Sequence, residues 1–193
     1  MPVGKYHFND PRSERRRRVA IHEAGHAVIA RKLGFVISRV SIANATTYVQ
    51  GDGDCHRRDY DGRCEIAGVP VSLITDGALN YLGRVKAIVQ MMAGFEAEVL
   101  ICPSPAAELW RSDIGDLGQI ARINNIGDPF DLNEIRECAR EVVSINRTTI
   151  DQVAVELSRC GEINGSELDA IMGMLRRGRG RRHLRNRSAP VSE

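Results

Sequence analysis

The sequence predicts a mainly helical fold with a small β-sheet directly after the first helix. Two observations support this prediction. Apolar residues recur at helical spacing over several long segments, whereas only short segments show the period of two that is typical of a half-buried strand. The chain has 193 residues, of which 42% are apolar and 27% are charged. This length is sufficient for one compact domain with a hydrophobic core and too short for two domains of ordinary size.

The first helix is expected to extend from Pro11 to about Leu33. Asp10 is a suitable N-cap, and proline is tolerated at the first helical position because its missing N–H needs no partner there. Gly34 follows the last apolar residue of the pattern and is expected to end the helix.

Short strands are expected after this helix. The period-two pattern from Val36 to Ile42 predicts a half-buried strand. A second strand is expected from Thr46 to Gln50, and another from about Val69 to Ile74. The segment Gly51–Gly68 between them is rich in Gly, Asp and Arg, so it is expected to form a loop.

The clearest helical pattern extends from Arg84 to Cys102, where apolar residues recur every three or four positions. Two prolines, Pro103 and Pro105, then prevent the helix from continuing. A shorter helix is expected to begin near Ser112.

Two capping signals predict the last helices. Asp131, with a Glu three residues later, is expected to begin one long helix whose buried face continues through Asn146 and which ends at Gly161. Ser166, with Asp169 three residues later, is expected to begin the final helix in the same way.

Charge is distributed unevenly along the chain. The 27 basic and 25 acidic residues give a net charge of +2, but the segment from Arg176 to Glu193 contains seven Arg and one Glu. This tail therefore has a net charge of +6, and the remainder of the chain has −4. We expect a polar lead over residues 1–14, one folded domain over residues 15–175 and a disordered Arg-rich tail over residues 176–193.

Other features argue against several classes of protein. The N-terminus lacks the apolar core of a secretion signal, and no uninterrupted apolar stretch is long enough to cross a membrane, so no membrane insertion is expected. The five Cys residues form no CxxC pair, which favours reduced thiols and a cytoplasmic location. No phosphate-binding loop of the GxxxxGK[ST] type is present, so the chain is not expected to bind ATP by itself.

The first helix contains His22-Glu23-Ala24-Gly25-His26, an HExxH motif. Helical geometry places its two imidazoles one turn apart on the same face, where both can bind one Zn²⁺ ion. Glu23 lies beside them and can take a proton from a zinc-bound water and deliver it to the leaving amine during peptide-bond hydrolysis. Small apolar residues surround the motif, so its polar side chains need partners. Gly25 is unfavourable within a helix, and a close backbone approach beside the metal would explain it.

A catalytic Zn²⁺ ion usually has three protein ligands, so a third ligand is needed from elsewhere in the chain. Metzincins supply a histidine six residues after the second one of the motif, but this position is Lys32. The remaining candidates are acidic residues further along the chain, namely Asp113, Asp116, Glu96 and Glu98. Glu96 falls within the apolar stripe of its helix and Glu98 nearly opposite, so spacing alone makes Glu96 the more unusual residue.

Several motifs in the same order resemble the zinc peptidase domain of the FtsH family of ATP-dependent proteases, over about Arg15 to Leu175. The matching segments are, in chain order, HEAGHAV from His22, the strand Val36–Ile42 with its Val-Ser-Ile end, the A-G-x-x-A-E segment Ala93–Glu98, the segment Gly115–Ala121 and the closing helices from Asn146 to Leu168. An ordered series of matches is much more specific than the HExxH motif alone.

The resemblance implies a helical, zincin-like peptidase domain of the FtsH type and the activity of a zinc-dependent metalloendopeptidase. It also implies which residues form the site. His22, His26 and Asp116 would be the zinc ligands, and Glu23 would be the general base. Asp113, three residues before Asp116, remains the alternative third ligand among the acidic candidates.

The same resemblance gives a role to Glu98, which matches the acidic residue that closes the A-G-x-x-A-E segment. It is expected to orient a ligand histidine through the ring nitrogen that does not bind the metal. This assignment follows the motif in preference to Glu96, which helical spacing alone favoured.

The expected function is hydrolysis of peptide bonds in flexible or unfolded protein chains. The membrane anchor and the AAA ATPase module of the family have no counterpart in this sequence, so the expected partners are a protein or peptide substrate, a separate ATPase and further copies of this chain. Two alternatives remain. One is a regulatory HExxH protease that cleaves one specific partner, and the other is a catalytically weak binding module whose Arg-rich tail holds nucleic acid or an ATPase.

Overall fold

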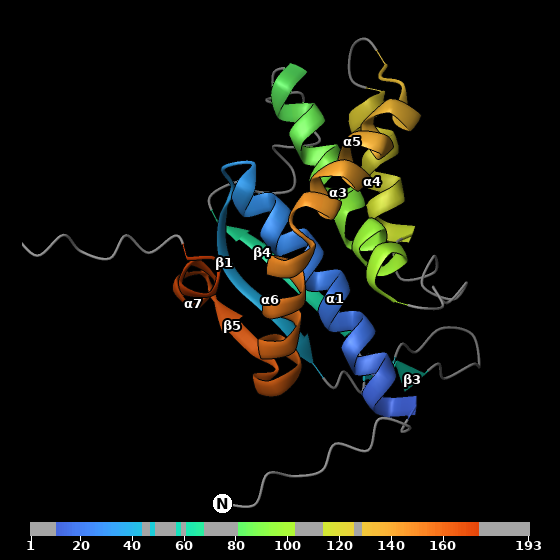
Figure 1. Ribbon diagram of the computed structural model, residues 1–193. Coiled ribbons are helices and arrows are strands. Elements are labelled where there is room, and N and C mark those ends of the chain that lie inside the picture. Colours follow the sequence, from blue (N-terminus) through green and yellow to red (C-terminus); the bar gives the residue numbers. More distant parts are fainter. Residues whose placement is uncertain are drawn as a thin grey trace, which may run out of the picture.

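The structure is a computed structural model, and it describes residues 11–43, 47–48, 57–58, 61–67, 81–102, 114–125 and 129–173. These residues form six helices, a three-stranded antiparallel sheet and a separate two-stranded antiparallel sheet (Figure 1), which confirms the mainly helical fold class. The helices are α1 (Pro11–Lys32), α3 (Tyr81–Ile101), α4 (Ile114–Asn124), α5 (Leu132–Ile145), α6 (Arg147–Cys160) and α7 (Gly165–Ile171). The strands are β1 (Val36–Ala43), β2 (Thr47–Tyr48), β3 (Arg57–Arg58), β4 (Asp61–Ala67) and β5 (Glu162–Asn164).

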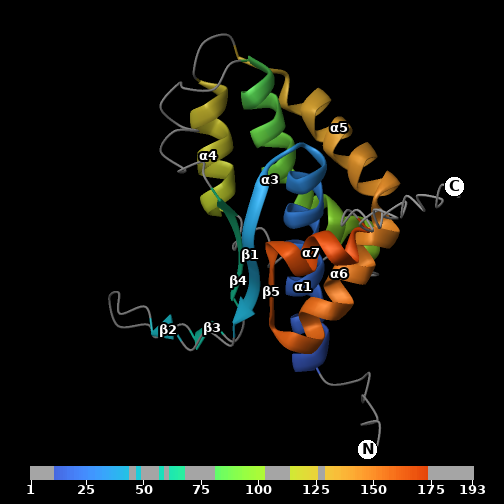
Figure 2. The ribbon, with the colours of Figure 1, turned by 90° about the vertical axis from the view of Figure 1, so that its left-hand side faces the viewer.

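Helix α1 is the central element of the fold, and α3, α6 and the sheet pack around it (Figures 1 and 2). Every residue from Ala20 to Ala30 is buried, so this part of the helix has little contact with solvent on any face. The helix ends where the sequence predicted, because Gly34 has a φ of 95° in the left-handed region. Any polar side chain in the buried stretch must therefore find its partners inside the protein.

Helices α1 and α3 approach each other closely at Gly25. A Cβ atom at this position would lie 2.7 Å from both the carbonyl oxygen of Ala93 and the Cβ of Ala97, and 3.1 Å from the Cα of Gly94. Real Cβ atoms do not come so close to backbone atoms, so the packing of the two helices leaves room only for glycine. The close backbone approach predicted from Gly25 is present, and α3 provides it.

The three-stranded sheet has the strand order β4-β1-β5, and both pairs are antiparallel, whereas among the described residues β2 and β3 pair only with each other. Strand β1 covers the predicted segment Val36–Ile42 and lies in the middle. Its register pairs Ile42 with Gly62 of β4 and Val40 with Ile163 of β5. Val40 and Ile163 are buried in the core, so one face of the sheet packs against the helices.

The predicted loop Gly51–Gly68 is wrong over β3 and β4. Strand β4 does show a period of two, because Gly62, Cys64 and Ile66 alternate with charged residues, and the last two pack partly buried against the core. The Gly, Asp and Arg residues around it concealed this pattern. Of the other predicted strands, Thr46–Gln50 is confirmed over β2 and otherwise lies outside the described residues, as does Val69–Ile74 entirely.

The single long helix predicted from Asp131 to Gly161 is wrong, because two helices, α5 and α6, meet at Asn146. Asp131 is the N-cap of α5, as predicted, and Gly161 ends α6 with a φ of 82°. Asn146 has a φ of −99° and a ψ of 8°, and its side-chain amide donates to the carbonyl of Val142 over 2.8 Å. Asparagine competes in this way with continued helix formation. The apolar pattern continues across the break because both helices bury a face, including Ile150 of α6.

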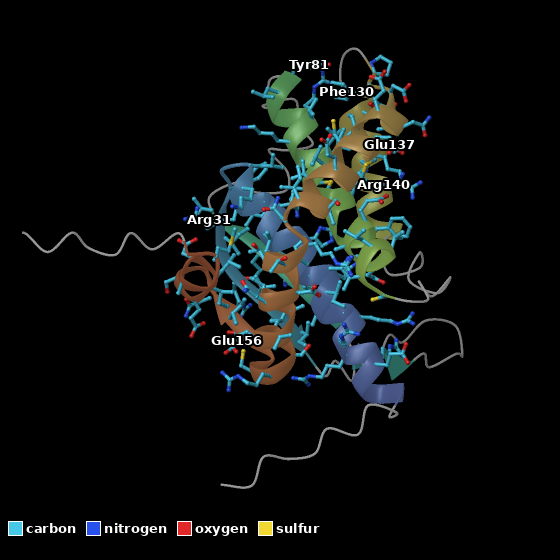
Figure 3. The ribbon with its side chains drawn as sticks, viewed as in Figure 1. Arg31, Tyr81, Phe130, Glu137, Arg140 and Glu156 are labelled. Atoms are coloured by element: carbon cyan, nitrogen blue, oxygen red, sulfur yellow. The ribbon has the colours of Figure 1, made fainter. Side chains whose placement is uncertain are left out.

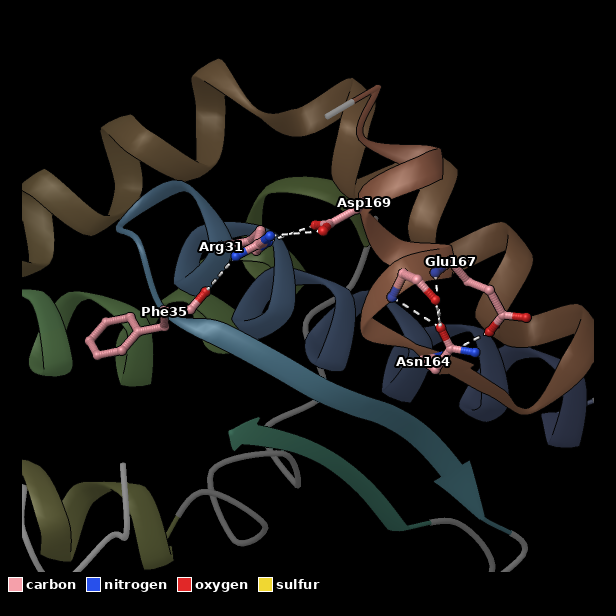
Figure 4. A network of polar contacts seen from close by, with 6 residues as sticks. Arg31, Phe35, Asn164, Glu167 and Asp169 are labelled. Atoms are coloured by element: carbon pink, nitrogen blue, oxygen red, sulfur yellow. Dashed lines mark hydrogen bonds and ion pairs between the residues drawn. The ribbon is translucent and has the colours of Figure 1, made fainter. Parts of the chain in front are cut away.

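Helix α7 begins after Asn164, which is its N-cap in place of the predicted Ser166. The Asn164 side-chain oxygen accepts from the N–H groups of Ser166 and Glu167, each over 3.0 Å. The Glu167 carboxylate accepts in return from the N–H of Asn164 over 2.8 Å, which completes a capping box (Figure 4). Asp169, the predicted partner of Ser166, instead forms an ion pair with Arg31.

Helix α3 lies between α1 and α5, and α4 packs beside it (Figure 2). Helix α3 begins at Tyr81, three residues before the predicted start, where the Tyr81 ring contacts Phe130 with ring centroids 4.9 Å apart (Figure 3). Helix α4 contributes the buried Ile120 and Ile123 to the core. None of the helices in the described part of the chain is long and apolar enough to span a membrane. The predicted tail over 176–193 lies outside the described residues, as does 1–10 of the predicted lead.

Candidate metal centre

The two histidines of the HExxH motif meet inside the protein. His22 and His26 lie one turn apart on the buried stretch of α1, with 8% and 5% of their surfaces exposed. Their Nε2 atoms are 2.9 Å apart, and the rings meet edge to face with centroids 4.6 Å apart. The spacing of four residues therefore brings one nitrogen of each ring to a common point.

The Nδ1 atom of each ring contacts a group on helix α3. The Nδ1 atom of His26 lies 2.8 Å from the carbonyl oxygen of Gln90, and that of His22 lies 2.6 Å from Oε1 of Glu98. A carbonyl or an ionised carboxylate can only accept a hydrogen bond, so the proton of each imidazole belongs on Nδ1. Both Nε2 lone pairs then point into one space, where they repel each other unless a cation or a shared proton lies between them.

The groups that meet the histidines share one face of α3, since Gln90, Gly94 and Glu98 follow one another at intervals of four residues. A Cβ atom at Gly94 would collide with Nε2 of His26 and lie 2.8 Å from Nε2 of His22. Glycine at this position therefore keeps a space open in front of both nitrogens. The sequence motif A-G-x-x-A-E contains this glycine, but only the packing of α3 on α1 reveals what it faces.

These distances fit a zinc ion. Two nitrogen ligands at about 2.0–2.1 Å from Zn²⁺ in tetrahedral geometry lie about 3.3 Å from each other. The observed Nε2–Nε2 distance of 2.9 Å is only slightly shorter, so small ring rotations bring His22 and His26 to it. Neutral imidazoles with Nδ1 bound to a carboxylate or carbonyl are the usual state of zinc-binding histidines.

Glu23 is also buried, with 6% of its surface exposed, and it faces a different neighbour. Its carboxylate lies against the backbone of β4 at Gly62, because a Cβ atom there would collide with Oε1, Cδ and Cγ of Glu23. Sequence reasoning missed Gly62, since the segment was expected to form a loop. The three polar residues of the motif are thus enclosed by α3 on one side and β4 on another.

Glu96 and Glu98 are both 1% exposed, so the helical-wheel argument that gave only Glu96 to the buried side is wrong. Helix α3 is covered by α1 on one face and by α5 on another. Glu96 pairs with the Nε atoms of Arg136 and Arg140 on α5, over 2.6 and 3.1 Å. Glu98 faces α1 instead, and it is this glutamate that contacts His22.

One turn after Glu98, the thiol of Cys102 is buried as well. Burial and, to a lesser extent, the negative charge of Glu98 raise the pKa of the Cys102 thiol. In the absence of a metal, both effects favour the neutral thiol.

The side chains of both predicted third ligands lie outside the described residues. Asp116 belongs to α4, one turn before the buried Ile120, but its side chain lies outside the described residues. Asp113 lies outside them altogether. Among the residues whose side chains are described, no three His, Cys, Asp or Glu side chains form a group that could hold a metal. The described part of the site therefore supplies two imidazole nitrogens and two buried carboxylates, those of Glu98 and Glu23.

Two nitrogens that converge on one point can bind a divalent cation, and a buried carboxylate next to them can accept and return a proton. Both functions are combined within five consecutive residues of the central helix, His22 to His26. No protein-family model matches the chain, and no curated protein matches it either.

Proposed function

We propose that this protein is a zinc-dependent metallopeptidase with an FtsH-type peptidase fold, and that it hydrolyses peptide bonds in flexible or unfolded protein chains. One observation carries the proposal. The Nε2 atoms of His22 and His26 are 2.9 Å apart, while both Nδ1 atoms are held by α3. Orienting two imidazoles in this way prepares a metal site, and burying them in the central helix would otherwise only lower stability.

The proposed ligands are His22, His26 and Asp116, with Asp113 as the alternative to Asp116. Helix α4 packs beside α3, so a carboxylate from the start of α4 would come from a different direction than the two histidines. Glu98 would fix the ring of one ligand and make its Nε2 a better electron donor. Bound zinc would polarise the scissile carbonyl and activate water at neutral pH.

Glu23 is the proposed general base. It takes a proton from the attacking water and then delivers the proton to the amine that leaves when the peptide bond breaks. Its burial excludes bulk water, which strengthens the interaction of its charge with the reacting groups. The same carboxylate thus acts first as a base and then, once protonated, as an acid.

Strand β4 offers a place for an extended substrate beside this carboxylate. It pairs with β1 along one edge, and no strand of the described residues pairs with its other edge (Figure 2). An extended peptide can add to such an edge through backbone hydrogen bonds. Because Glu23 lies against Gly62 of β4, a peptide bound there would pass close to the proposed base. A flexible or unfolded segment can adopt this extended conformation, which supports the proposed substrate class.

The test compares the wild type with Glu23→Gln and with Glu14→Gln. Glu14 is a matched control because it lies exposed on the same helix, where it pairs with Arg18. We expect one zinc ion per chain in all three proteins by elemental analysis. Casein or peptide cleavage should be equal in the wild type and Glu14→Gln and at least about 100-fold slower in Glu23→Gln. Equal cleavage by Glu23→Gln would contradict the mechanism, and wild type without zinc would contradict the site.

The third ligand is tested with Asp116→Asn and Asp113→Asn, measured by zinc affinity. The variant that removes the ligand should lose most of its zinc, and the other should retain it. If both retain it, neither aspartate is a ligand. A zinc-loaded wild type that leaves casein intact would favour the alternative of a regulatory protease that cleaves one specific partner.

A further inference from the structure

Two glycines from different elements meet the HExxH motif. A Cβ atom on Gly94 of α3 would have its three nearest atoms in His22 and His26, whereas the three nearest to a Cβ on Gly62 of β4 all belong to Glu23. Each glycine therefore leaves room for a different part of the motif. The Gly94 space lies in front of the imidazole nitrogens, and the Gly62 space holds the carboxylate of Glu23.

The backbone of β4 does not itself require glycine at position 62. Gly62 pairs in regular antiparallel register with Ile42 of β1, and its φ is not in the left-handed region. Any residue can adopt such a conformation, and glycine within a strand lowers stability because it has no side chain to pack. Glycine is therefore needed at position 62 because there is no room for a side chain, and not because of the backbone conformation.

The residues on the core-facing side of β4 show what fills that space. Gly62, Cys64 and Ile66 lie on the same side of the strand, and the last two pack partly buried against the core. At the position where the next inward side chain would stand, the carboxylate of Glu23 from α1 lies against the strand. The Glu23 side chain of α1 thus occupies the place that a side chain of β4 would otherwise fill.

We propose that Gly62 is a positioning residue for Glu23. Because β4 has no side chain there, the carboxylate of Glu23 is held between α1 and the strand backbone. A side chain at position 62 would displace this carboxylate and leave His22 and His26 in place, since α3 holds both rings. The catalytic consequence rests on the proposed function, but the contact between Gly62 and Glu23 does not.

The contact is tested through stability, which needs no activity. Gly62→Ala should lower the Tm of the wild type by about 3–8 °C, because an added methyl group in a filled space forces its neighbours to move. In a Glu23→Ala background, where the obstructing side chain is absent, the same substitution should lower Tm by less than about a third of that amount. Gly118→Ala is the control, since a Cβ on Gly118 meets no atom of the described residues within 4 Å. An equal loss of Tm in both backgrounds would overturn the proposal.

The separate roles of Gly62 and Gly94 are tested through zinc affinity and kinetics. Gly62→Ala should bind zinc within about 2-fold of the wild type, with kcat at least about 10-fold lower and KM nearly unchanged. Gly94→Ala should instead bind zinc at least about 10-fold more weakly, because its methyl group fills the space in front of both Nε2 atoms. Weak zinc binding or an unchanged kcat in Gly62→Ala would overturn the positioning role. If the wild type cleaves nothing, the proposed function fails, whereas the coupling of Tm values still decides whether Gly62 holds Glu23.

Discussion

The Nδ1 atom of His22 lies 2.6 Å from Oε1 of Glu98, a side chain that is only 1% exposed. This contact joins the helix that carries the HExxH motif to α3, across 76 positions of sequence. A buried carboxylate that accepts from one imidazole nitrogen fixes the ring and makes the other nitrogen a better ligand. Metal binding by His22 should therefore depend on Glu98.

The first prediction compares Glu98→Gln with Glu96→Gln, two equal changes on one helix. Glu98→Gln should weaken zinc binding about 10- to 100-fold, because the histidine loses its charged partner. Glu96→Gln should change zinc affinity little, since Glu96 faces the two arginines of α5. Competition with a chromogenic zinc chelator measures both. Similar losses in the two variants would mean that Glu98 acts only through the packing of α3.

The second prediction uses two glycine-to-alanine changes with opposite expected signs. Gly25→Ala should destabilise the protein by about 1–3 kcal/mol, because the new methyl group would meet Ala93 and Ala97 of α3. This loss should outweigh the better helix propensity of alanine. Gly118→Ala on α4, where a Cβ meets nothing within 4 Å in the described part of the chain, should instead stabilise by about 0.5–1 kcal/mol. Urea unfolding measures both, and a stabilising Gly25→Ala would contradict the close approach of α1 and α3.

Sequence patterns predicted those parts of the fold whose signals are local. Helix α1 ends at Lys32, just before Gly34, and β1 covers the segment with a period of two, because each signal lies within or next to the element itself. The break at Asn146 was not predictable from periodicity, since the apolar pattern continues through two separate helices. Strand β4 was missed because the composition around Gly62 is typical of a loop.

The candidate site also combines features that local sequence patterns predict with features that they do not. The HExxH spacing predicts that His22 and His26 share a face, because this geometry belongs to one helix. The carbonyl of Gln90 and the spaces at Gly62 and Gly94 depend on how α3 and β4 pack on α1, which no local pattern contains. A buried carbonyl oxygen also has no sequence signature, since every residue has one.

The third prediction concerns the ion-pair network of Glu96 with Arg136 and Arg140. Glu96 is 1% exposed, while the two arginine side chains are 38% and 45% exposed (Arg140 is labelled in Figure 3). Arg136→Met or Arg140→Met alone leaves Glu96 one partner and should cost about 1 kcal/mol or less. The double variant leaves a buried carboxylate unpaired and should cost about 3–5 kcal/mol. Denaturant unfolding of all three variants measures the coupling, and simple additivity would contradict it.

The last prediction concerns the ion pair of Arg31 and Asp169, which fastens α7 to the end of α1 (Figure 4). The Arg31 Nε and Nη2 atoms donate to the two carboxylate oxygens of Asp169 over 2.6 and 2.8 Å. These hydrogen bonds and the positive charge of Arg31 lower the pKa of Asp169. A carboxyl whose pKa is lower in the folded than in the unfolded protein stabilises the fold above its unfolded pKa. This contribution is lost as the pH falls through the folded pKa.

Asp169→Asn should therefore be less stable than the wild type by about 1–2 kcal/mol at pH 7. The difference should shrink as the pH falls below about 4, because the wild type then loses the same charge by protonation. Glu156→Gln is the control, since Glu156 forms an exposed ion pair with Arg159 one turn along α6 and should matter little at either pH. Thermal unfolding between pH 7 and pH 3 measures both variants. A difference for Asp169→Asn that persists undiminished at pH 3 would show that the carboxylate charge is not its source.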